Sequence, residues 1–101
     1  MYGLTNSDLE VIVNTIKNFP EVEEAIIFGS RALNTFKKGS DIDIALKGKE
    51  IGIITATISG ILNDESPLPY FCDVLDYDHI DNEDLRDHID RVGCLIYKKL
   101  E

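Results

Sequence analysis

Residues 28–45 read FGSRALNTFKKGSDIDIA, a Gly-Ser turn followed after ten residues by two aspartates one residue apart. Residues 25–28 form a continuous apolar run that is typical of a buried strand, and Gly29 ends it. Residues 41–46 alternate between apolar Ile42, Ile44 and Leu46 and the set Asp41, Asp43 and Ala45, as a strand with two different faces does. The stretch therefore predicts a hairpin-like pair of strands with two carboxylates on one face.

These paired aspartates favour a divalent cation. Side chains two residues apart in a strand lie about 6.5 Å apart on the same face. Two carboxylates at about 6 Å repel each other by roughly 3 kcal/mol at an effective dielectric constant near 20. Mg²⁺ would turn this repulsion into attraction, since it binds carboxylates together with substrate phosphates, and two such ions can assist phosphoryl transfer. A third carboxylate, Asp73, lies inside the strand predicted over residues 70–76, where Asp76 is the weaker candidate.

The turn before the aspartates suits a phosphate group. Gly29 lets the backbone come close to a phosphate, and Ser30 offers a hydroxyl and an N–H group at the start of a short helix predicted over residues 30–36. A simple helix cap is the alternative for Ser30. Arg31 either reaches a phosphate or is a surface arginine without a ligand. The candidate site thus has Gly29, Ser30 and Arg31 for the nucleotide, and Asp41, Asp43 and Asp73 for metal and catalysis.

The rest of the chain predicts an α+β fold. A helix opens at residues 5–8, where Ser7 and Glu10 have capping-box spacing, and Pro20 ends it. A middle helix is expected over residues 48–62, and a last helix begins after Asp81 or Asn82. A final strand covers residues 94–97. We expect a single domain over residues 1–101, with a small mixed β-sheet and helices packed on it in two layers.

Charge and composition exclude some functions. The 101 residues include 10 Lys and Arg and 19 Asp and Glu, which gives a net charge of −9. This negative charge disfavours the binding of nucleic acid. Five of the ten basic residues lie between positions 31 and 49, where they would suit an anion, and eight acids between positions 73 and 90 would suit a basic partner. His79 and His88, among these acids, are expected to be surface residues without a chemical role.

The cellular setting follows from the cysteines and the apolar segments. Cys72 and Cys94 lack metal-binding spacing and are expected to be buried free thiols in a reducing cytoplasm. The chain has no apolar run of about 20 residues and no basic-then-apolar start, so neither a membrane span nor a signal peptide is expected. We therefore expect a cytoplasmic protein.

The motif resembles that of the nucleotidyltransferase superfamily related to DNA polymerase beta. Gly-Ser, about ten residues, Asp-x-Asp and a later carboxylate stand here as Gly29, Ser30, Asp41, Asp43 and Asp73. Within this superfamily the chain is most similar to the minimal nucleotidyltransferases, over residues 24–97. The family often reads Gly-Ser-Arg-Ala-Arg-Gly, whereas Leu33 and Asn34 stand at the last two positions here. Leu33 removes a basic residue, while asparagine tolerates the left-handed conformation that a turn glycine adopts.

The resemblance implies transfer of AMP from ATP to a hydroxyl group. Asp41 and Asp43 would bind two Mg²⁺ ions, and Asp73 would help to activate the attacking hydroxyl. In the paired systems the hydroxyl belongs to a tyrosine of a small helical HEPN-domain toxin, whose RNase activity the modification silences. The chain would then act as an antitoxin, either as a homodimer or in a hetero-oligomer with its partner.

Two alternatives remain open. The chain could be an inactive binding module that neutralises its partner by contact alone. It could also transfer the nucleotide to a small molecule, as antibiotic-modifying relatives do, although those enzymes carry additional domains. An RNA acceptor is less favoured because of the negative charge.

Overall fold

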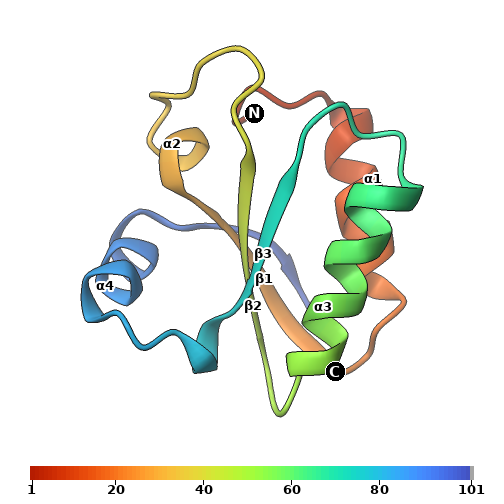
Figure 1. The fold of residues 1–101 in the computed structure, drawn as a ribbon, viewed down its shortest axis with the longest axis vertical. Helices are drawn as coiled ribbons and strands as arrows, with labels where there is room; N and C mark the ends of the chain where they lie inside the picture. Colours follow the sequence, from red (N-terminus) through yellow and green to blue (C-terminus); the bar gives the residue numbers. More distant parts are fainter. Residues whose placement is uncertain (101) are drawn as a thin grey trace.

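The computed structural model describes residues 1–100, and it contains one four-stranded sheet with helices against both of its faces (Figure 1). In chain order the elements are α1 (Asn6–Lys17), β1 (Val22–Phe28), α2 (Gly29–Ala32), β2 (Ile42–Gly48), α3 (Gly52–Gly60), a π-helical turn (Ile61–Glu65), β3 (Cys72–Asp76), a 3₁₀ turn (Tyr77–His79), α4 (Glu83–Val92) and β4 (Cys94–Lys98). The predicted α+β class and mixed sheet are confirmed.

The sheet has the strand order β3-β2-β1-β4. β1 pairs antiparallel with both β2 and β4, whereas β2 and β3 run parallel. The antiparallel pairing of β1 and β2 confirms the predicted hairpin-like unit. The parallel pair requires a crossover, and α3 together with the turn that follows it supplies this connection.

The two faces of the sheet have separate apolar clusters. On one face, α1 and α3 both pack against the sheet (Figure 1), and the fully buried Ile12, Ile16, Ile27, Ile44 and Ile58 belong to this main cluster. On the other face α4 alone covers part of the sheet, with Ile26, Phe28, Ala45 and Ile89 as the buried residues of the smaller cluster. This half-covered face is where the predicted site residues lie.

The ends of three helices differ from the sequence prediction. The capping box of α1 is formed by Thr5 and Asp8, which exchange two hydrogen bonds of 3.0 Å, so the assignment to Ser7 and Glu10 was wrong. α2 ends at Ala32 instead of reaching residue 36, because Asn34 adopts a left-handed backbone with φ of 60°. α3 begins at Gly52, since the residues up to Gly48 continue β2.

Both cysteines are free, as expected, although only Cys72 is fully buried and Cys94 is half-buried. Burial raises the pKa of the Cys72 thiol to about 11, so this side chain is a poor nucleophile. Of the helices within residues 1–100, none has the length and the apolar character that crossing a bilayer demands.

Candidate active site

The Gly-Ser turn lies directly against Asp43, the aspartate of β2. Phe28, the last residue of β1, is paired with Asp43, so the turn that follows β1 begins beside this carboxylate. Gly29 has a φ of +73°, and a Cβ atom at this position would overlap the Asp43 carboxylate oxygen Oδ2. The position therefore requires glycine for two reasons, its backbone conformation and the close approach of Asp43.

Asp43 and Asp73 lie directly opposite each other on adjacent strands. They are register partners in the parallel pair of β2 and β3, so their side chains leave the same face of the sheet from strands about 4.8 Å apart. Asp41 precedes β2 by one residue rather than lying within the strand. Asp41 and Asp73 are exposed and Asp43 is half-buried. The structure thus brings the three predicted carboxylates to one end of the open sheet face.

The charges at this site act on one another. Burial and then the neighbouring charges of Asp73 and Asp41 raise the pKa of Asp43 above its ordinary value of 3.8. His88 and Arg31 act in the opposite direction and lower the pKa, but less strongly. The site therefore has an excess of negative charge at its centre, as expected for a place where a cation binds.

The donor set fits Mg²⁺, which prefers carboxylate oxygens and retains several waters. Among residues 1–100, no three side chains of the His, Cys, Asp and Glu types are gathered closely enough to hold a metal ion as they stand. Asp41 and Asp73 are exposed, so both carboxylates are accessible from solvent. Asp76, the weaker candidate, binds the main chain of Asp78 and the ring of His79 instead.

Arg31 is buried and bonded to main-chain oxygens, so the alternative of a surface arginine is wrong. Its side chain is only 2% exposed, and its guanidinium lies over the rings of Phe36 and Tyr70. The main-chain oxygen of Ser40 accepts hydrogen bonds from Nη2 at 2.7 Å and from Nε at 3.2 Å. Nε also donates to the main-chain oxygen of Asp41 at 3.3 Å, and Nη1 donates to the main-chain oxygen of Tyr2 at 2.9 Å. Arg31 thereby fixes the loop that leads into Asp41.

The basic stretch between positions 31 and 49 does not gather around the aspartates. Lys47 lies four residues along β2 from Asp43, roughly 13 Å away along the strand, with its ammonium over the Tyr77 ring. Lys37 and Lys38 line a pocket of about 480 Å³ beside the buried Arg31. These two lysines are the basic side chains of the stretch that remain near the loop preceding Asp41.

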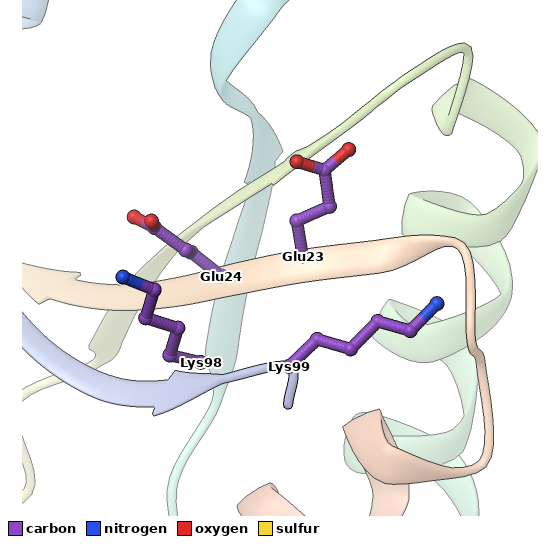
Figure 2. A pocket seen from close by; sticks show the side chains of 4 residues that line it. All are labelled: Glu23, Glu24, Lys98 and Lys99. Carbon is purple, nitrogen blue, oxygen red and sulfur yellow. The ribbon is translucent and has the colours of Figure 1, made fainter. Parts of the chain in front are cut away.

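A second pocket, of about 340 Å³, lies at the opposite end of the sheet (Figure 2). Two glutamates of β1 and two lysines at the end of the chain's last strand line it, namely Glu23, Glu24, Lys98 and Lys99. The charges of these side chains cancel, and Lys99 Nζ already donates to the main-chain oxygen of Pro20 at 2.7 Å. This pocket is therefore a weaker candidate for a site than the carboxylate cluster.

Sequence reasoning missed His88. This residue of α4 is half-buried, and its Nε2 accepts a 3.0 Å hydrogen bond from the N–H group of Gly29. The two residues are 59 positions apart, and no local pattern connects them. The only sequence signal is its position one residue before Ile89, whose apolar side chain turns this part of α4 toward the sheet.

Replacing Gly29 by alanine is expected to destabilise the fold by about 2 kcal/mol and to impair the site. A Cβ atom at a φ of +73° is strained, at a typical cost of 1–3 kcal/mol, and it displaces the Asp43 carboxylate. The check is the free energy of unfolding from a urea titration. Gly39→Ala is the matched control, since Gly39 also has a positive φ of 82° but has open space around it. Equal losses in both variants would show that the approach of Asp43 adds nothing.

A Gly-Ser turn facing carboxylates on two adjacent strands, within a small mixed sheet, is the arrangement of a nucleotidyltransferase domain. The family described as Polymerase beta, Nucleotidyltransferase matches residues 10–101. The chain therefore belongs to this nucleotidyltransferase family. A comparison with curated proteins gives no significant match.

Solved structures share the fold. A chain of a toxin–antitoxin complex with AMP-PNP superposes with a TM-score of 0.74 at 21% identity, covering 90% of this chain and 73% of the other. A chain from the toxin–antitoxin MntA–HepT gives 0.69 at 19% identity, with 94% and 74% covered. A chain from a complex of tri-AMPylated Shewanella oneidensis HEPN toxin with MNT antitoxin gives 0.69 at 20% identity, with 98% and 74% covered.

Proposed function

We propose that this chain transfers AMP from ATP to a hydroxyl group of a partner protein, with a HEPN-type toxin tyrosine as the acceptor, and so acts as an antitoxin. The single observation that carries the proposal is the register of Asp43 opposite Asp73, with the Gly29–Ser30 turn packed against Asp43. Family membership supports nucleotidyl transfer as the reaction class. The toxin–antitoxin complexes that share the fold, one with AMP-PNP and one with an AMPylated toxin, support the nucleotide and the partner.

In this mechanism the turn holds the triphosphate and the carboxylates hold the cations. Asp41 and Asp43 would hold Mg²⁺, which would supply charge neutralisation for the phosphates. Gly29 allows the close approach of backbone to phosphate, and Ser30 contacts the phosphate through its hydroxyl and N–H groups. The residue that receives the proton of the acceptor hydroxyl is Asp73, which lies exposed beside Asp43.

The reaction is a displacement at the α-phosphorus of ATP. The acceptor oxygen forms a bond to this phosphorus, the bond to the β-phosphate breaks, and pyrophosphate leaves. The hydroxyl proton passes to Asp73 and then to solvent.

The test uses ATP labelled at the α-phosphate, Mg²⁺ and the protein encoded by the neighbouring gene. The parent chain should label that protein, and Asp41→Asn/Asp43→Asn should not. Asp64→Asn serves as the control, since Asp64 is an exposed acid in the turn after α3. Label from the γ-phosphate should not be transferred, which separates AMP transfer from phosphorylation. Equal labelling by parent and double variant, or none by either, would favour a module that acts by contact alone. Labelling of a small molecule instead would change the acceptor class.

A further inference from the structure

We propose that His88 is a positioning residue of the nucleotide site, and that its imidazole holds the Gly-Ser turn in the conformation that receives the triphosphate. The proposal rests on the proposed function and names a residue that the motif does not contain. The Gly29 N–H group donates to His88 Nε2 at 3.0 Å. Nε2 must therefore carry a lone pair, which places the proton of the neutral ring on Nδ1.

The imidazole contacts two consecutive residues, Phe28 at the end of β1 and Gly29 of the turn. Besides the bond to Gly29, the ring packs edge-to-face against the ring of Phe28, with centroids 6.2 Å apart and planes at 79°. Phe28 is itself 5% exposed and belongs to the cluster beneath α4. The histidine ring is thus fixed in both position and orientation relative to the turn.

The helix that carries His88 is anchored independently of the turn. Ile89 is 2% exposed in the same cluster as Ile26 and Ala45, and Asn82 caps the helix through a 3.1 Å bond to the N–H group of Leu85. At the other end of α4, a Cβ atom on Gly93 would overlap Ile26 and the carbonyl of Ile89, which shows how closely the helix lies on the sheet. A histidine on this helix acts as a rigid support for the turn.

The turn needs such a support. Glycine has more conformational freedom than any other residue, and the first N–H groups of a helix have no partner within the helix. Gly29 is the first residue of α2, so its donor has no partner within that helix and bonds to His88 instead. The Gly29–His88 bond selects one of the conformations open to the turn, the one in which Gly29 lies against Asp43.

The experiment compares His88→Ala and His88→Gln in the labelling reaction at varied ATP concentrations. The glutamine side chain reaches a similar distance and offers an oxygen acceptor in place of Nε2. We expect kcat/KM for ATP to fall about tenfold in the alanine variant, mainly through KM, because one hydrogen bond to a partly buried N–H group is lost. The glutamine variant should recover most of this loss. His79→Ala is the control, since His79 is 73% exposed and contacts Asp76.

A direct measurement keeps this inference separate from the proposed function. In ¹⁵N-labelled protein, a scalar coupling between the Gly29 amide nitrogen and His88 Nε2 should be visible across the hydrogen bond. Absence of this coupling, alanine kinetics equal to the parent, or failure of glutamine to rescue would each overturn the role of His88. If the parent transfers no AMP, the proposed function fails. The affinity of the parent, His88→Ala and His88→Gln for Mg²⁺-ATP is then measured in place of the kinetics. A similar affinity in all three, including no affinity in any, would overturn the role of His88 as well.

Discussion

Replacing Asp43 by asparagine is expected to lower AMP transfer by about 10³-fold and, at the same time, to raise the stability of the unliganded protein. Loss of a carboxylate that holds the cation removes several kcal/mol of transition-state stabilisation, and each 1.36 kcal/mol is a factor of ten. In the protein without a bound cation, the charged Asp43 carboxylate lowers the stability of the folded state. Burial, Asp73 and Asp41 all raise its pKa, which means that the folded state disfavours its charged form.

The stability gain should depend on pH with a defined sign. Because the pKa of Asp43 is higher in the folded chain than its ordinary value of 3.8, the unfolded chain releases this proton first as the pH rises. The contribution of Asp43 to stability therefore falls as the pH rises from about 3.8 through the folded value, and the penalty is complete above that value. Asparagine avoids the penalty, so its advantage is largest at neutral pH and vanishes below the unfolded pKa.

Thermal unfolding of the parent and of Asp43→Asn between pH 3 and pH 7 measures this dependence, with the exposed Asp64→Asn as the control. Mg²⁺ should raise the melting temperature of the parent but not that of Asp43→Asn, because a ligand stabilises only the state that binds it. An advantage of asparagine that persists unchanged at pH 3, or an equal Mg²⁺ effect in both proteins, would contradict the assignment.

Replacing Arg31 by methionine is expected to cost about 3 kcal/mol of unfolding free energy. Methionine fills part of the space between Phe36 and Tyr70, but it leaves the main-chain oxygens of Ser40, Asp41 and Tyr2 without these donors. An unsatisfied buried acceptor costs about 1–3 kcal/mol, and some of these oxygens will regain water. For a domain of this size the loss corresponds to a melting temperature lower by about 12–24 °C.

Differential scanning calorimetry checks this prediction, and two further variants sharpen it. Arg31→Lys keeps the charge but loses the planar group that reaches three carbonyls. The stability of this variant should therefore lie between that of the parent and that of the methionine variant. Arg91→Met removes an exposed arginine whose pair with Asp87 is 64% exposed on both sides, and it should change the stability by less than about 0.5 kcal/mol. A loss at Arg31 no larger than at Arg91 would show that the buried bonds contribute little.

Much of the fold could be predicted because its signals are local. The apolar run of β1 and the period of two in β2 each lie within a few residues. Asn34 was expected to take the place of a turn glycine, and its φ of 60° confirms this. The cap of α1 shows the limit of such patterns. Ser7 was predicted as the capping residue but Thr5 is the one observed, because two polar residues with similar spacing to an acid can each cap the same helix end.

The site was predictable in its residue types but not in its supports. Asp73 could be assigned to a strand from the sequence, whereas its position opposite Asp43 depends on the packing that sets the parallel register. Arg31 lies among basic residues in the sequence, and only tertiary structure shows that it is buried on main-chain oxygens. His88 lies among acids on α4, and its contact with Gly29 depends on how that helix docks.

The parallel pairing of β2 and β3 has a consequence for how this domain can vary. The separation of Asp43 and Asp73 is determined by the backbone ladder between the two strands, and the path of the chain between them has no direct influence on it. Insertions or deletions in residues 66–69, between the π-helical turn and β3, should therefore leave the two carboxylates in place. Homologous domains are free to change length there without any adjustment of their chemistry.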